Sequence, residues 1–97
     1  METAVKTPSE INVHFDSRCS VSYKLKSCKI SNEENKEFIF YGISLRYIDE
    51  KGTDESAEIL DISTDMLKVY SLMTKMAAGF VTTVSFYDII YDFLTEN

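Results

Sequence analysis

Apolar and polar residues alternate along the first two thirds of the chain, a pattern typical of β-strands with one buried face. The alternation predicts strands over residues 11–15, 18–30, 38–48 and 57–62. Polar segments separate these strands, and Gly52 in the third segment can adopt a positive φ. We therefore expect an antiparallel sheet whose strands follow one another in chain order.

The register of the two long strands follows from the side on which their apolar residues fall. In an antiparallel pair, directly opposed residues share one face of the sheet. The register that opposes the core-face residues of both strands also opposes Cys28 to Phe40 and Ile30 to Phe38 on the other face. We therefore expect the hairpin to carry a small apolar cluster on its outer face, near its turn.

The last third of the chain changes to helical spacing. Met66, Met73 and Met76 fall on one helical face, which we interpret as part of the core rather than as an adaptable binding surface. Ser63 is the expected N-cap of this helix. Gly79 is suited to the left-handed position that ends it.

A second helix is expected to begin at Ser85, with Asp88 in the place that completes a capping box. Its apolar arc spans roughly 200°, against the ~100° that one contact needs. The sheet can cover one side of such a helix, and the methionine-rich helix or a second copy of the protein must cover the other. The arc consists of Phe86, Tyr87, Ile89, Ile90, Tyr91, Phe93 and Leu94.

The order of elements predicts the fold class and the domain limits. A chain of 97 residues is one domain. We expect residues 11–97 to form an α+β domain, a three- to four-stranded antiparallel meander followed by two C-terminal helices packed on one face. Residues 1–10 are polar and without periodicity, so they are expected to form a disordered N-terminal arm. Without a signal peptide or a long apolar run, a cytoplasmic protein without a membrane span is expected.

Composition argues against several chemistries. The single histidine, His14, cannot build a multi-histidine metal site, and three separated glycines cannot form a phosphate loop. His14 could act as a base for Cys19 or Cys28, but nothing in the sequence would orient it. We expect two buried thiols on opposite faces of one strand and no disulfide. The expectation is a protein that is not an enzyme and that holds no metal or cofactor.

Two pairs of carboxylates stand four residues apart, Asp61 with Asp65 and Asp88 with Asp92. Such a pair could share a proton or hold a divalent cation. Hard cations require more oxygen ligands than one pair supplies. We therefore interpret these residues as helix caps and as a solvated polar edge.

The net charge of −6 is distributed unevenly. Residues 1–48 carry seven basic and six acidic side chains, whereas residues 49–97 carry three basic and ten acidic ones. The second half would therefore repel a phosphate backbone.

The outer face of the long hairpin is the most informative predicted surface. It presents Lys24, Lys26 and Arg46 beside Phe38 and Phe40, and such a face can stack bases and track phosphates. Binding of single-stranded nucleic acid is therefore one hypothesis, and the acidic net charge ranks it below protein binding. Binding of a small ligand between sheet and helices, near Tyr23, Tyr41, Tyr47 and Tyr70, is another.

The leading hypothesis is a small non-enzymatic protein-interaction module, such as a regulatory protein, that forms a homodimer and binds a protein partner. Apolar side chains that the chain itself leaves uncovered would carry the interaction. The candidate interface residues are Ile30, Phe38, Phe40 and Tyr91.

Four short segments also carry a resemblance to a known family: residues 23–25, 40–44, 58–65 and 87–94. In order and spacing they resemble a family of short uncharacterised bacterial proteins catalogued only as a domain of unknown function. The resemblance covers roughly residues 20–95. It implies a soluble bacterial single domain and supplies no activity, and the N-terminal arm is longer here than in the family pattern.

Overall fold

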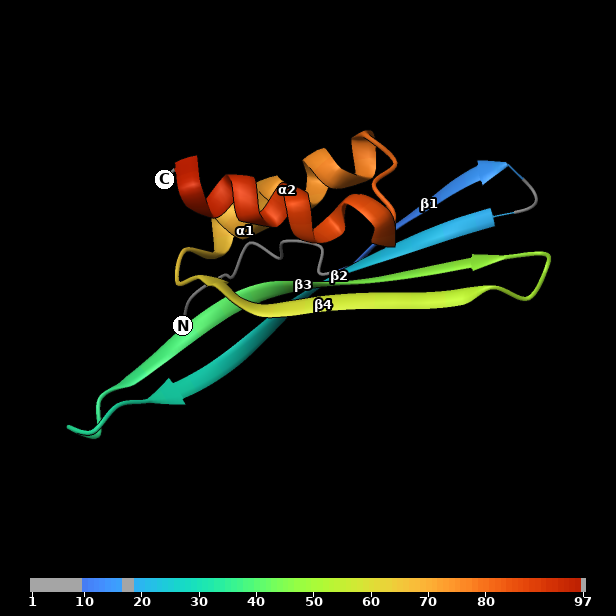
Figure 1. The fold of residues 1–97 in the computed structure, drawn as a ribbon. Helices are drawn as coiled ribbons and strands as arrows, with labels where there is room; N and C mark the ends of the chain where they lie inside the picture. The colour runs from blue at the N-terminus through green and yellow to red at the C-terminus, as the bar shows by residue number, and fades with distance from the viewer. Residues whose placement is uncertain (1–9, 17–18, 97) are drawn as a thin grey trace, which may run out of the picture.

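The computed structural model describes residues 10–16 and 19–96, with residues 13–16 described by their backbone alone. The strands form one antiparallel sheet in the order β1-β2-β3-β4, and both helices lie on one of its faces (Figure 1). The predicted α+β architecture is therefore confirmed, with four strands. The elements are β1 (Glu10–Asp16), β2 (Cys19–Ser31), β3 (Glu37–Asp49), β4 (Asp54–Ser63), α1 (Met66–Ala78) and α2 (Thr83–Glu96).

The first strand begins one residue earlier than expected. Glu10, assigned to the arm by its polarity, starts β1 and lies opposite Lys24 of β2. The remainder of the predicted arm, residues 1–9, lies outside the described residues.

The strands β2 and β3 pair along their whole length in the predicted register. Cys28 lies opposite Phe40 and Ile30 lies opposite Phe38, so the apolar residues near the turn share the face that the helices leave uncovered. We call this side of the sheet the outer face. Both cysteines are free, as expected, although they are half-buried rather than buried.

The β2–β3 hairpin is longer than the strands beside it. β1 pairs with β2 no further than Lys24, and β4 pairs with β3 no further than Tyr41. Residues 28–40 therefore form a two-stranded arm that projects beyond the helices (Figure 1). Among the described residues, neither edge of this arm has a neighbouring strand.

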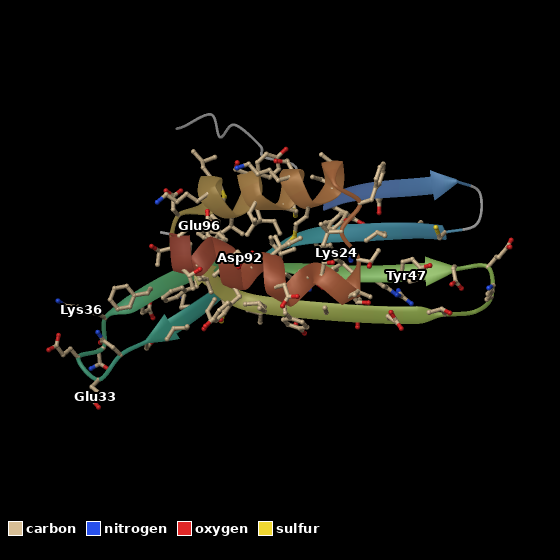
Figure 2. All side chains as sticks on the ribbon, turned by 45° about the horizontal axis from the view of Figure 1, so that its top comes forward. Lys24, Glu33, Lys36, Tyr47, Asp92 and Glu96 are labelled. Atoms are coloured by element: carbon tan, nitrogen blue, oxygen red, sulfur yellow. The ribbon has the colours of Figure 1, made fainter. Side chains whose placement is uncertain are left out.

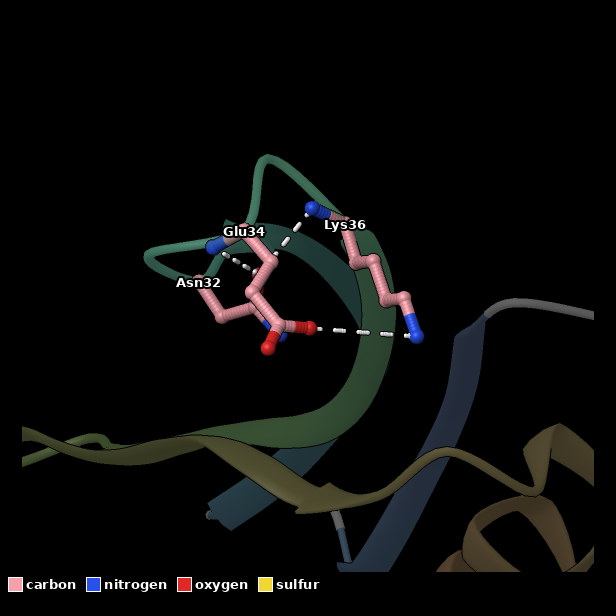
Figure 3. A network of polar contacts seen from close by, with 3 residues as sticks. All are labelled: Asn32, Glu34 and Lys36. Atoms are coloured by element: carbon pink, nitrogen blue, oxygen red, sulfur yellow. Dashed lines mark hydrogen bonds and ion pairs between the residues drawn. The ribbon is translucent and has the colours of Figure 1, made fainter.

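A side-chain amide closes the turn of the arm (Figure 3). The Oδ1 atom of Asn32 accepts hydrogen bonds from the backbone N–H groups of Glu34, at 2.9 Å, and Lys36, at 3.0 Å. Asn35 adopts a positive φ of 63°, a conformation that asparagine tolerates better than most residues. The polar segment between the strands is therefore an ordered turn.

The β3–β4 turn repeats this design with an acid and a glycine. The Oδ1 atom of Asp49 accepts from the backbone N–H groups of Lys51 and Thr53, both at 3.0 Å, and Gly52 has a φ of 91°. Desolvation acts to raise the pKa of Asp49, but the hydrogen bonds from Thr53 and Lys51 outweigh it and lower the pKa.

Gly42 marks the place where the arm leaves the four-stranded sheet. The β3–β4 pairing is irregular between Tyr41 and Ile43, and the backbone of β4 crosses closely over Gly42. A Cβ atom on Gly42 would overlap with the carbonyl oxygen of Ile59 and the Cα atom of Leu60. Only glycine fits at this position, because the obstacle is backbone rather than a movable side chain.

The core lies between the two helices and the sheet. Tyr23 is fully buried there, and its hydroxyl donates a hydrogen bond of 2.5 Å to the carbonyl oxygen of Val81, between α1 and α2. Burial raises the pKa of Tyr23 to about 12. Met73 and Met76 are buried, which confirms their assignment to the core, whereas Met66 is half-buried. The buried set is Val21, Tyr23, Ile43, Leu45, Ala57, Ile62, Val69, Leu72, Met73, Met76, Ala77, Phe86 and Ile90.

The start of α1 differs from the prediction. The N-cap is Asp65, not Ser63, and its carboxylate accepts from the backbone N–H groups of Leu67, at 3.1 Å, and Lys68, at 3.4 Å. Ser63 still belongs to β4, and its hydroxyl accepts from the N–H of Asp65 at 3.0 Å. The extended pairing of β4 therefore delays the helix by two residues.

The end of α1 falls at Gly79, but the left-handed residue is the next one. Gly79 has a φ of −92°, whereas Phe80 has a φ of 54°. The N–H of Val81 donates to the carbonyl of Met76 at 3.0 Å, and the N–H of Phe80 donates to Ala77 at 3.3 Å. These two bonds form a Schellman motif with Phe80, rather than Gly79, in the strained position.

The start of α2 also differs from the prediction. The helix begins at Thr83, so Ser85 and Asp88 lie within it and do not form a capping box. The Oγ1 atom of Thr83 donates a hydrogen bond of 2.7 Å to Glu55 of β4. Because α2 starts directly after the Schellman motif, the chain has reached helical geometry before Ser85.

Candidate functional site

The first apolar surface is a cluster on the outer face of the arm, formed by Cys28, Ile30, Phe38 and Phe40. Cross-strand pairing brings these four residues together, as the register predicted. Ile30 is 39% exposed and Phe38 is 42% exposed, and the other two are half-buried. We call this surface the arm cluster.

No second layer of structure supports the arm within the described residues. The arm bends away from both helices, and its tip lies beyond their ends (Figure 1). Ile39, on the opposite face of the arm, is also exposed. A two-stranded hairpin by itself is only marginally stable in water. The arm cluster contains no charged side chain, and the ion pair between Lys29 and Glu37, at 3.6 Å, lies on the other face.

The second apolar surface runs along the solvent side of α2. Val84, Tyr87, Tyr91 and Leu94 recur at helical spacing and are 86%, 52%, 68% and 46% exposed. We call these four residues the α2 stripe. Phe86 and Ile90 on the other side of the helix are buried, so the wide apolar arc is covered on one side only.

Acidic residues of α2 follow one edge of the α2 stripe. The helix carries Asp88, Asp92 and Glu96 and no basic residue, and two of these acids are marked in Figure 2. The strand β4, which packs beside α2 at the edge of the sheet, also has acids and no basic residue. Two of its acids, Asp54 and Glu58, lie on the outer face beside Arg46 and Lys26, and Glu55 accepts the hydrogen bond from Thr83 at the start of α2.

The structure separates the four predicted interface residues into two places. Ile30, Phe38 and Phe40 share the arm cluster, whereas Tyr91 lies on α2. The prediction did not include Val84, the most exposed of the large apolar residues whose side chains the structure describes, because it was assigned to a position before the helix. Its spacing of seven from Tyr91 is the signal that places both residues on one helical face.

The basic residues proposed for nucleic acid do lie on the outer face, around an open hollow of about 270 Å³. Arg46 donates two hydrogen bonds to the carboxylate of Asp54, at 2.9 and 2.6 Å, and Lys26 lies 3.9 Å from Glu58. The hydrogen bonds between Arg46 and Asp54 raise the pKa of the guanidinium and lower the pKa of the carboxyl group. Lys24 faces Glu10 across the β1–β2 pair.

This charge balance argues against phosphate binding at the outer face. Each of the three basic residues stands beside an acid from a neighbouring strand. The aromatic pair, Phe38 and Phe40, lies further along β3, beyond Gly42. The face therefore lacks both a net positive charge and aromatic side chains set among its basic residues.

A second open cavity, of about 340 Å³, lies between the β3–β4 turn and the start of α2. Its walls include Tyr47, Asp49, Glu55 and Thr83. The hydroxyl of Tyr47 donates a 3.3 Å hydrogen bond to Asp49, and burial, followed by the charge of Asp49, raises the pKa of Tyr47. Of the four tyrosines considered for a ligand site, Tyr47 alone lines this cavity.

The structure adds no support for the remaining candidate sites, which are the carboxylate pairs and the pairing of His14 with a cysteine. Asp65 acts as a helix cap, and among the described residues no group of three His, Cys, Asp or Glu side chains could hold a metal ion. The side chain of His14 lies outside the description, so its pairing with a cysteine stays a hypothesis. In the part of the chain that the structure describes, neither helix has the length and apolar character needed to cross a membrane.

The comparison with protein families confirms the resemblance of the short segments but corrects its extent, because the match includes residues 2–19, so the N-terminal arm is not an addition to the family pattern. A family model described as a family of unknown function (DUF6514) matches residues 2–96, which is nearly the whole chain. The chain belongs to this family. No curated protein and no solved structure matches the chain.

Proposed function

We propose that this member of DUF6514 is a non-enzymatic protein-interaction module that forms a homodimer through the arm cluster. The observation that carries the proposal is the projection of residues 28–40 beyond both helices with apolar side chains exposed. Exposed apolar surface on a two-stranded hairpin is costly unless a partner covers it. A second copy supplies that cover.

The composition of the arm cluster suits self-association. In a twofold dimer, each surface meets the same surface of its partner, so an excess of one charge within it would meet the same excess. The cluster contains three large apolar residues and a cysteine and no charge. Facing two clusters therefore buries Ile30, Phe38 and Phe40 without an electrostatic penalty.

We also propose that the protein acts in the bacterial cytoplasm. The resemblance of its segments supports a bacterial source. The two free cysteines support a reducing compartment, because extracellular domains of this size commonly pair their cysteines.

The test is the molar mass in solution, measured by light scattering across a range of protein and salt concentrations. We expect a mass near twice 11.1 kDa that does not fall with added salt, since the contact is apolar. Phe38→Glu should reduce the mass to that of one chain, because it places a charge in the arm cluster.

Tyr91→Glu is the matched control, because it introduces the same charge at an exposed aromatic residue on α2. This variant should remain dimeric, and circular dichroism should show that both variants are folded. A wild-type protein that stays monomeric throughout, or a folded Phe38→Glu variant that remains a dimer, would rule out the proposed interface.

A further inference from the structure

We infer that the α2 stripe binds a basic amphipathic helix of a partner protein. The proposed dimer uses the arm cluster, so this second surface is independent of it. Val84 and Leu94, at the two ends of the stripe, are ten residues apart. A helix rises about 1.5 Å per residue, so the stripe is about 15 Å long, which matches roughly three turns of a docked helix.

The stripe is already in place before a partner binds. α2 is held to the sheet by Phe86 and Ile90, both fully buried, so its outer side chains project from an ordered helix. A partner would lose entropy mainly on its own side of the contact. The stripe therefore differs from an apolar segment that orders only on binding.

The charge beside the stripe indicates the kind of partner. Asp88 and Asp92 follow one edge of the stripe, and no basic side chain of the described residues forms an ion pair with either of them. This contrasts with Asp54 and Glu58 on the outer face, which both have a cationic neighbour within the chain. The carboxylates along α2 are therefore available to lysine or arginine side chains of a partner.

The same charges disfavour a second copy of the chain at this surface. Antiparallel pairing of two α2 helices would bring Asp88 and Asp92 toward the same residues of the other copy. Each helix would contribute these two acids and no basic residue of its own to such a contact. Like charges facing one another across an interface are unfavourable, so the stripe fits a basic partner better than itself.

The experiment uses two synthetic helices as probes. The first is a leucine–lysine peptide of about five turns with its leucines on one face, and the second carries glutamate in place of lysine. Binding of each labelled peptide to the full chain is measured by fluorescence anisotropy. We expect the lysine peptide to bind at least about tenfold more tightly than the glutamate peptide, with affinity falling as salt rises.

Matched variants separate the stripe from the overall acidity of the protein. Asp88→Lys with Asp92→Lys should weaken the lysine peptide by about tenfold or more. Glu33→Lys with Glu34→Lys makes the same change in net charge at the tip of the arm, where Figure 2 marks Glu33 away from α2, and should leave binding nearly unchanged. Tyr91→Ser should also weaken binding, whereas Leu67→Ser, at an exposed apolar residue of α1, should not.

Three results would overturn the inference. One is equal loss of affinity in the two charge-reversal variants, which would show attraction by net charge alone. Another is binding that survives Tyr91→Ser with the strength of the wild-type protein. The third is a fall in molar mass caused by Tyr91→Ser, which would make the stripe a contact between copies. None of these results depends on whether the arm cluster forms a dimer.

Discussion

The arm cluster and the α2 stripe are both exposed and apolar, but they differ in what lies beneath and beside them. The stripe belongs to a helix whose other side is buried in the core, and carboxylates line it. The arm cluster belongs to a two-stranded hairpin that no other described residues of the chain cover, and it contains no charge. In the two roles that we propose, support and neighbouring charge, rather than apolar exposure alone, distinguish the self-associating surface from the one suited to a basic partner.

The largest expected effect comes from Gly42, where the arm joins the sheet that carries α2. Gly42→Ala should reduce the free energy of unfolding by roughly 3 kcal/mol or more, because the added methyl group meets the backbone of β4. Both surfaces should be lost together. Gly79→Ala is the control, since its Cβ would lie 3.5 Å from the nearest atom and its φ is negative. Urea denaturation compares the two, and equal stabilities would contradict the close approach at Gly42.

A substitution at Tyr23 should destabilise α2, which carries the stripe, and leave the arm intact. Tyr23→Phe keeps the ring but removes the hydrogen bond to Val81, which should cost about 1 to 2 kcal/mol. Amide hydrogen exchange should increase in α2 more than in residues 28–40. Faster exchange confined to the arm would contradict this assignment.

The raised pKa of Tyr23 also predicts a loss of stability at high pH. The native phenol stays protonated up to about pH 12, whereas the unfolded one ionises near its ordinary value of about 10. The contribution is therefore complete below pH 10 and is lost as the pH rises towards 12, by about 2 to 3 kcal/mol. The stability advantage of the wild-type protein over Tyr23→Phe should disappear over this range and reverse by about pH 12, as denaturation curves of the two proteins would measure.

A pair of equivalent substitutions compares the two surfaces directly. Phe38 and Leu94 are 42% and 46% exposed, one in each surface. If the arm forms the dimer, the melting temperature of the wild-type protein rises with protein concentration. Phe38→Ser should weaken the free energy of dimer association by about 1 kcal/mol, so the melting temperature of this variant should depend less on concentration. Leu94→Ser should retain it. The reverse result in a thermal-melt series would exchange the roles of the two surfaces.

The smallest expected effect concerns the two hairpin turns. Asn35→Gly should stabilise the turn of the arm by about 0.5 kcal/mol, because glycine adopts a φ of 63° with less strain. Gly52→Asn, at the equivalent left-handed position of the β3–β4 turn, should have the opposite sign. Chemical denaturation of both variants and the double variant measures the difference, and equal signs would contradict the shared geometry of the turns.

The sequence predicted one of the two candidate surfaces and only part of the other. The outer-face pairing of Ile30 with Phe38 followed from the register alone, because one shift of the strands satisfies both faces. The exposure of the α2 stripe could not be predicted, since an apolar arc does not state which of its sides the chain will cover. The ion pair of Arg46 with Asp54 required knowledge of which β4 residues lie beside β3.

The amino-acid sequence by itself determined the strands, the helices, their order and the register of the long hairpin, because periods of 2 and 3.6 residues are local properties. The tertiary structure decided the helix ends, since the pairing of β4 delayed α1 to Asp65 and the bonds at Phe80 allowed α2 to begin at Thr83. It also decided that Gly42 needs to be glycine and that Tyr23 bonds to Val81. These contacts join segments distant along the chain, so they exist only once the sheet and helices have packed together.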